Sequence, residues 1–270
     1  MPTFKKIIRK LNNASLFFVP LIVTLLAITA IISGAIGGIK YTLESIQRNP
    51  ITNGYVEPPD LGKIIDLVQD ATVTVICGDP ENYESQGSGW SVLLTPYENS
   101  SAEDKKLLEE NPNSIMTNHH VIEKCIDSGN RLYVRSYEEV AEAFVWNYDE
   151  NADLALLLTS LETTHLYSTI SEPAPGFWVM AAGSPHGLDG SLTFGYIINT
   201  NGTEVYSTAA LSPGNSGGPL VDNEGNVIAT NVSFRTDGQN FSIGQALDAA
   251  CVEIIECGDE PFWYAELIDE

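Results

Sequence analysis

Basic residues are scarce beyond the first 40 positions of this 270-residue sequence. Five of its 13 lysines and arginines lie within that stretch, so residues 41–270 carry 8 basic and 36 acidic residues. A surface this acidic repels phosphate backbones, which excludes nucleic acid as a partner bound through counterion release. The charge favours solubility in a saline medium and is compatible with cationic substrates.

Charge is absent altogether from positions 11–39, and residues 15–39 are strongly apolar. A helix of that length would measure ~37 Å at ~1.5 Å per residue, enough to cross a hydrocarbon core of ~30 Å. By the positive-inside rule, the basic segment 1–14 stays in the cytoplasm and the rest is exported. We therefore predict a transmembrane signal anchor at 15–39 and a juxtamembrane linker at 40–59. Cleavage of residues 1–35 as a signal peptide, which would secrete the protein, remains the alternative.

Cysteine is also sparse, and the spacings of zinc sites are missing. Neither Cys-x-x-Cys nor His-Glu-x-x-His occurs, so we expect no metal and no cofactor. The four cysteines of an exported chain allow three disulfide connectivities, which sequence alone cannot separate. We favour Cys77 with Cys125, and Cys251 with Cys257 because that pair is close in sequence. Free buried thiols are the alternative.

The amino-acid composition is that of a folded protein, with 43% hydrophobic residues, 22 glycines and 14 prolines. Short β-branched and aromatic runs separated by turn residues predict an all-β sandwich or barrel, with a break into two halves near 168–175. We expect a short helix at 60–68 capped by Asp60, an acidic excursion with a brief helix at 96–113, and a closing helix at 247–256. The expected strands lie at 71–77, 87–94, 131–137, 142–148, 153–159, 177–183, 191–199, 203–209, 227–234 and 240–246. No internal sequence repeat is visible.

The strongest chemical signal is the segment Gly214-Asn215-Ser216-Gly217-Gly218. Glycines beside a serine let the backbone turn so that the hydroxyl projects and nearby N–H groups converge, as acyl transfer requires. An α/β-hydrolase would place its histidine after the serine. That class is excluded, because every histidine precedes Ser216: His119, His120, His165 and His186.

A serine hydroxyl needs a base, and that base needs a carboxylate to hold its tautomer. His120, Asp153 and Ser216 supply these groups in chain order, with Asp149 as the nearest rival carboxylate. Gly87-Ser88-Gly89-Trp90 lacks the third glycine and the lysine of a phosphate loop, so we interpret it as a strand-entry turn. His165 and His186 are predicted to be surface or loop residues.

The motifs TNHHV at 117–121, ADLALL at 152–157, AAGSPHG at 181–187 and SPGNSGGPL at 212–220 resemble those of chymotrypsin-fold serine proteases. Among these the likeness is to the Htr/Deg type, over roughly residues 61–250. The resemblance implies two six-stranded antiparallel β-barrels, about 60–167 and 168–246, with a short C-terminal helix and an acidic tail at 258–270. It also makes His120 the catalytic histidine and His119 a neighbour. The family commonly carries a PDZ domain, which we do not expect after Glu256 in this sequence.

The resemblance further implies that the backbone N–H groups of Gly214 and Ser216 form an oxyanion hole. The expected specificity pocket consists of Ala210, Leu211, Val232, Ser233 and Phe234. Ala210 stands where an Arg- or Lys-specific protease would carry an aspartate, so we expect a small or medium apolar residue before the scissile bond. Thr208 replaces an aspartate of the family, without a consequence that the sequence reveals.

We thus expect a cofactor-free serine endopeptidase that acts on polypeptides in the periplasm or outside the cell. Its substrates would be exported or misfolded proteins. The alternative is a protease-fold peptide-binding or holdase module whose triad is latent. An esterase with the same triad is a third option. Trimers are common in the resembling family, but no interface can be identified in the sequence.

Overall fold

The computed structural model describes residues 54–92, 102–137, 139–167, 173–235, 240–246, 249–250 and 254. Within these ranges, no helix is long and apolar enough to span a membrane. The predicted anchor at 15–39, the tail at 258–270 and the Cys251–Cys257 pairing all lie outside them. Most of the closing helix expected at 247–256 does so as well.

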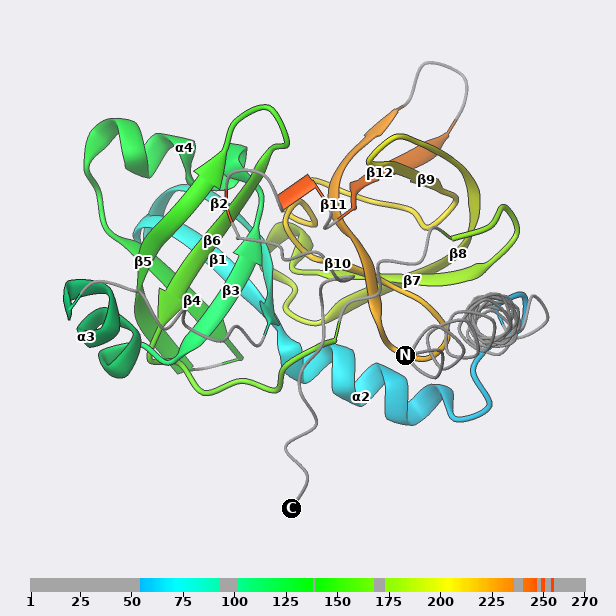
Figure 1. Ribbon diagram of the computed structural model, residues 1–270, viewed down its shortest axis with the longest axis horizontal. Coiled ribbons are helices and arrows are strands. Elements are labelled where there is room, and N and C mark those ends of the chain that lie inside the picture. The colour runs from blue at the N-terminus through cyan, green and yellow to red at the C-terminus, as the bar shows by residue number, and fades with distance from the viewer. Residues whose placement is uncertain are drawn as a thin grey trace, which may run out of the picture. The chain divides into compact units, whose positions relative to one another are not determined.

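The first half of the described chain forms a closed antiparallel barrel (Figure 1). Its six strands pair in the cyclic order β1-β2-β3-β6-β5-β4. They are β1 (Thr72–Asp79), β2 (Asn82–Val92), β3 (Asn113–Thr117), β4 (Leu132–Ser136), β5 (Glu139–Asp149) and β6 (Leu154–Thr159). The strand β6 is buried along its whole length, which explains its continuous apolar sequence.

The second half forms another closed six-stranded barrel. Its strands are β7 (Trp178–Gly183), β8 (Ser191–Asn201), β9 (Glu204–Ser207), β10 (Pro219–Val221), β11 (Val227–Arg235) and β12 (Phe241–Gln245). They pair in the order β7-β8-β9-β12-β11-β10, which is the connection pattern of the first barrel repeated. The prediction of two six-stranded antiparallel barrels is confirmed, and the topology repeats although the sequence shows no repeat.

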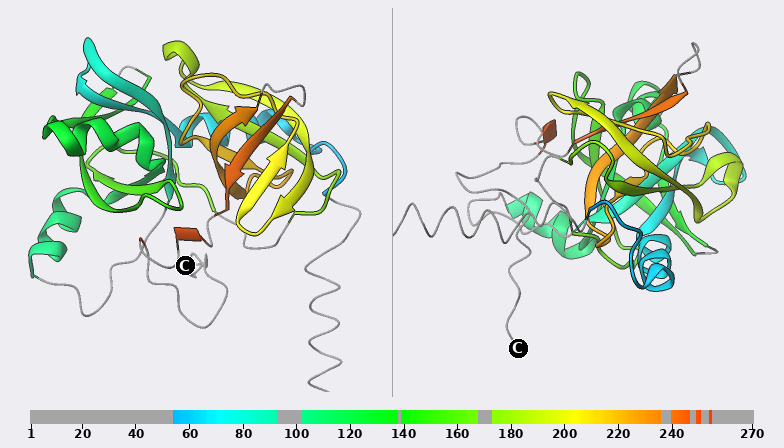
Figure 2. Two further views of the ribbon diagram at one scale, coloured as in Figure 1. Left: turned by 90° about the horizontal axis from the view of Figure 1, so that it is seen from above. Right: turned by 90° about the vertical axis from the view of Figure 1, so that its right-hand side faces the viewer.

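Each barrel has its own apolar core, and a third cluster joins them. Val75 and Leu157 lie in the core of the first barrel, and Val179 and Ala229 in that of the second. The joining cluster combines Trp90, Met116 and Leu156 of the first barrel with Trp178, Met180 and Val221 of the second. The two barrels lie side by side (Figures 1 and 2). Burial of these large side chains between the barrels stabilises that arrangement.

Helix α2 (Leu61–Ala71) contributes Val68 and Ala71 to this joining cluster. It begins as predicted at Asp60, whose carboxylate accepts the N–H of Lys63 at 3.3 Å. It ends where Thr72 donates its hydroxyl to the Val68 carbonyl and the β-branched run of β1 starts. Helix α3 (Ala102–Glu110) lies in the acidic excursion, where a brief helix was expected.

Helix α4 (His119–Ser128) was not predicted. Its buried residues Val121, Ile122 and Cys125 follow a helical spacing, and Gly129 ends it in the left-handed conformation with φ 68°. The disulfide between Cys77 of β1 and Cys125 of α4 ties this helix to the barrel, which confirms the first predicted pairing.

Two strands were missed, and one prediction about a turn is wrong. The short strands β3 and β10 were not expected. Gly87-Ser88-Gly89-Trp90 was interpreted as a strand-entry turn, but it lies in the interior of β2, which begins at Asn82. Its glycines are needed there for close packing, since a Cβ at Gly89 would lie 2.6 Å from a methyl group of Ile115.

Candidate active site

His120 stands in the first turn of α4, directly after the end of β3. Asn118 precedes this helix, yet its side chain makes no capping hydrogen bond. Its amide group donates instead to the main-chain carbonyl of Asp153 at 2.8 Å. Asn118 therefore links the two segments that carry the predicted base and carboxylate.

The carboxylate of Asp153 binds His120 through both oxygens. Oδ1 accepts the backbone N–H of His120 at 2.9 Å, and Oδ2 lies 2.7 Å from Nδ1 of the ring. An ionised carboxylate only accepts hydrogen bonds, so Nδ1 carries the ring proton and Nε2 is left with its lone pair free. The side chain of Asp153 is 26% exposed and that of His120 43%, so the pair is open on the imidazole side.

Asp149, the rival carboxylate, has a different place. Its Oδ1 accepts the backbone N–H groups of Asn151 and Ala152 at 2.7 and 3.2 Å, which closes the turn before β6. His119 also points elsewhere, since it is buried and stacked on the ring of Tyr148 with centroids 4.8 Å apart. The geometry thus brings Asp153 to His120, whereas Asp149 and His119 make structural contacts.

Ser216 follows a tight turn formed by Ser212-Pro213-Gly214-Asn215. The N–H of Asn215 donates to the Ser212 carbonyl at 3.0 Å, and Gly214 has φ +103°. Proline at the second position and a positive-φ glycine at the third are the signature of a type II turn. In the described part of the chain, the N–H groups of Gly214 and Ser216 donate to no protein acceptor.

The hydroxyl of Ser216 donates to the carbonyl of Val232 on β11 at 2.9 Å. Ser216 and His120 line the same open cavity, but within the described residues no hydrogen bond joins them. In this structure the Ser216 hydroxyl thus has the Val232 carbonyl as its partner in place of His120.

The shared cavity has a volume of about 330 Å³. Four of the five predicted pocket residues line it, and among the described residues its lining contains no carboxylate. Ala210 is the exception, because it is exposed and its carbonyl accepts the hydroxyl of Thr193. The sequence analysis missed Ser212 and Pro213 as lining residues, although both belong to the Ser216 motif. The lining residues are His120, Leu211, Ser212, Pro213, Ser216, Val232, Ser233 and Phe234.

The chain is similar to known serine proteases. Residues 107–229 match the trypsin-like peptidase domain family, a range that includes all three residues of the predicted triad. A DegP-like periplasmic serine endoprotease of Hahella chejuensis is 29% identical over 175 residues. The alignment covers 60% of this chain and 32% of that protein. Over residues 107–229 the chain is therefore similar to trypsin-like peptidases.

The chain is also similar to serine proteases of the DegP/Htr type. The Do-like serine protease HtrB of Bacillus subtilis is 30% identical over 251 residues, which cover 82% of this chain and 52% of HtrB. The chain thus spans about half of that relative and about a third of the Hahella protein. The crystal structure of a serine endoprotease from Yersinia pestis is similar in fold, with a TM-score of 0.57 and 22% identity. That similarity covers 72% of this chain and 65% of the Yersinia chain.

Among the described residues that line the cavity, His120 is the one histidine, so His165 and His186 lie elsewhere. His165 packs against β2, where its Nδ1 lies 2.7 Å from the hydroxyl of Ser91, and burial lowers its pKa. The Ser91 hydroxyl in turn accepts the hydroxyl of Thr163 at 2.7 Å. His186 lies in the segment before β8 with φ 55°. His186 belongs to the 3-10 helix η1 (Pro185–Gly187) and is exposed. His165 is therefore a loop residue and His186 a surface residue, as expected.

Proposed function

We propose that this chain is a serine endopeptidase that hydrolyses peptide bonds through Ser216, His120 and Asp153. The observation that carries the proposal is the double contact of Asp153 with His120, beside a cavity that Ser216 also lines. The carboxylate holds the imidazole with Nε2 free to accept a proton. The relatives from Hahella chejuensis and Bacillus subtilis are named as serine proteases, which supports peptide-bond hydrolysis.

In the proposed reaction, the Ser216 hydroxyl turns from Val232 toward His120 and attacks the scissile carbonyl. His120 takes the hydroxyl proton and passes it to the leaving amine, which forms an acyl-enzyme and frees the first product. Water then attacks the ester, with His120 again as the base. The N–H groups of Gly214 and Ser216 would stabilise the negative oxygen in both steps.

The test of this function is labelling of the purified chain by a fluorophosphonate. Such a probe phosphonylates a serine only where a base activates the hydroxyl and an oxyanion site receives the phosphonyl oxygen. We expect one adduct, on the tryptic peptide that contains Ser216, together with cleavage of an unfolded protein. A folded chain that neither labels nor cleaves would contradict the proposal.

One observation favours the alternative of a latent peptide-binding or holdase module. The Ser216 hydroxyl is occupied with the Val232 carbonyl, so the resting site lacks the nucleophile–base hydrogen bond. A binding module would retain an unfolded polypeptide without cleaving it. Binding with no cleavage and no labelling would decide for this alternative.

We also propose that the chain acts outside the cytoplasm, held by an anchor at 15–39, on exported or misfolded proteins. The long uncharged apolar segment and the disulfide support this location. The named relatives include periplasmic proteases, which agrees with it.

We propose that this cavity sets the cleavage specificity. Leu211, Val232 and Phe234 give it apolar walls, and among the described residues that line it none is acidic. We therefore expect cleavage after small or medium apolar residues, since an unpaired Arg or Lys side chain would lose its hydration in the pocket. Mass-spectrometric mapping of the cleavage sites in an unfolded protein would measure this preference. A map dominated by Arg and Lys would show the pocket assignment to be wrong.

A further inference from the structure

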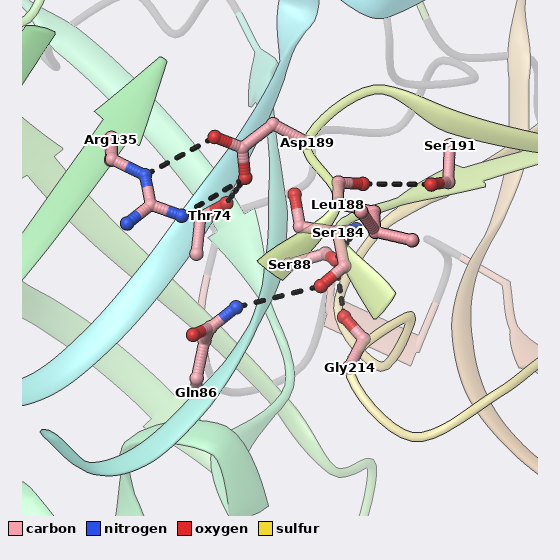
Figure 3. Close-up of polar contacts among 9 residues, drawn as sticks. All are labelled: Thr74, Gln86, Ser88, Arg135, Ser184, Leu188, Asp189, Ser191 and Gly214. Atoms are coloured by element: carbon pink, nitrogen blue, oxygen red, sulfur yellow. Dashed lines mark hydrogen bonds and ion pairs between the residues drawn. The ribbon is translucent and has the colours of Figure 1, made fainter. Parts of the chain in front are cut away.

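Ser88 lies fully buried on β2, at the point where the first barrel contacts the Ser216 loop. Its hydroxyl donates to the carbonyl of Gly214 at 2.6 Å and accepts the N–H of Ser184 at 2.8 Å (Figure 3). Ser184 and Gly214 both belong to the second barrel's half of the chain. One hydroxyl therefore connects β2 with two segments beside the candidate active site.

The main chain of Ser88 adds two more connections. Its N–H donates to the carbonyl of Ser216 at 2.7 Å, and its carbonyl accepts the hydroxyl of Thr117 at 2.6 Å. Thr117 ends the strand that leads to His120. Gly217 permits this close approach, since a Cβ there would lie 2.0 Å from the Ser88 carbonyl oxygen.

The segment that contains Ser184 is itself anchored to the first barrel. A few residues further on, Asp189 accepts the guanidinium of Arg135 at 3.1 Å and the hydroxyl of Thr74 at 2.6 Å (Figure 3). Ser184 also packs against the turn, because a Cβ at Gly214 would lie 2.9 Å from the Ser184 carbonyl oxygen. The Ser88 hydroxyl thus bonds to Gly214 on one side and to an anchored segment on the other.

We propose that Ser88 is a positioning residue for the oxyanion hole. The inference rests on the proposed function, in which the N–H groups of Gly214 and Ser216 receive the oxyanion. Ser88 binds the Gly214 carbonyl through its hydroxyl and the Ser216 carbonyl through its N–H. Its own carbonyl binds Thr117, at the end of the strand that precedes His120. The donors of such a hole act at 2.7–3.1 Å from the oxygen, so a small shift of the turn weakens them.

The space around the Ser88 hydroxyl is too tight for a water molecule to take its place. A Cβ on Gly183 would lie 2.8 Å from the Ser88 oxygen and equally near the side-chain oxygen of Asn215. Removing the hydroxyl would leave a gap smaller than a water molecule needs. The Gly214 carbonyl and the Ser184 N–H would then lack partners, and the turn would move to find new ones.

The test compares Ser88→Ala with Ser91→Ala in the full chain. Ser91 is a matched control because it lies on the same strand, is equally buried, and bonds through its hydroxyl to His165, outside the cavity. For Ser88→Ala we expect kcat to fall about 10- to 100-fold, less than the ~10²–10³ lost with a whole oxyanion donor. KM should stay within about twofold, because the cavity lining is unchanged.

A peptidyl boronic acid with an apolar side chain provides the decisive readout, because its tetrahedral adduct places an oxygen in the hole. Its affinity should fall by the same factor as kcat in Ser88→Ala and stay unchanged in Ser91→Ala. A purely structural role would lower the unfolding midpoint of both variants and leave both kcat and inhibitor affinity unchanged in both. That result would overturn the proposal.

Two further measurements keep the proposal testable. If Ser88→Ala does not fold, Thr117→Val removes the hydroxyl that binds the Ser88 carbonyl and should show a smaller loss of kcat with KM retained. Amide hydrogen exchange of residues 212–217 needs no catalysis and should be faster in Ser88→Ala than in Ser91→Ala. If the wild type proves inactive, the proposed function fails, and equal exchange in the two variants would still refute the positioning role.

Discussion

Replacing Ser216 by alanine is expected to lower kcat by about 10⁶-fold, the cost of losing the nucleophile of a Ser-His-Asp triad. Without the hydroxyl no acyl-enzyme forms, and His120 has no proton to accept. Some acceleration over the uncatalysed reaction should remain, about 10³-fold, from the oxyanion donors and from substrate binding. Release of product from an apolar peptide substrate, measured with high enzyme concentration, gives both numbers.

The loss in Ser216→Ala would not be caused by unfolding. The substitution removes one hydrogen bond, to the Val232 carbonyl, and such a bond contributes about 1 kcal/mol. Val232 lines the cavity, so water can replace the lost hydroxyl. Ser191→Ala is the matched control, because that hydroxyl bonds to the Leu188 carbonyl in the second barrel, and it should keep full activity. Equal activity of Ser216→Ala and the wild type would assign the cleavage to a contaminating protease.

The parts of the fold that follow local periodicity could be predicted from the sequence. Asp60 and its apolar stripe predicted α2, and the β-branched runs predicted most strands. The strand β10 has three residues inside a glycine-rich motif, too few for a period to show. Helix α4 does carry an apolar helical spacing and a terminal glycine, but its first residues were interpreted only as a motif around His120.

The candidate site could be predicted as far as chain order and motifs allow. Sequence spacing could not separate Asp153 from Asp149, because both precede the same strand and only the turn geometry decides which one reaches His120. The rotamer of Ser216 depends on a carbonyl of β11 that is distant in sequence. The contacts of Ser88 depend on the packing of two barrels, which no local pattern encodes.

The double contact between Asp153 and His120 leads to the second large effect. Both contacts need an acceptor, one for the backbone N–H and one for the ring N–H. Asparagine offers one acceptor oxygen and one NH₂ group. When the oxygen takes the backbone N–H, the NH₂ group faces Nδ1, which must then accept, so the ring proton moves to Nε2. In that tautomer His120 cannot take the Ser216 proton.

We therefore expect Asp153→Asn to lower kcat by about 10⁴-fold at neutral pH, with KM little changed because Asp153 does not line the cavity. Asp149→Asn is the matched control, a carboxylate-to-amide change in the adjoining turn, and it should keep most of the activity. Steady-state kinetics of both variants on one apolar peptide substrate measure the difference. The opposite ranking, with Asp149→Asn the more damaged enzyme, would transfer the orienting role to Asp149. Because the two changes are chemically identical, the ratio of their kcat values isolates what the contact with His120 contributes to catalysis.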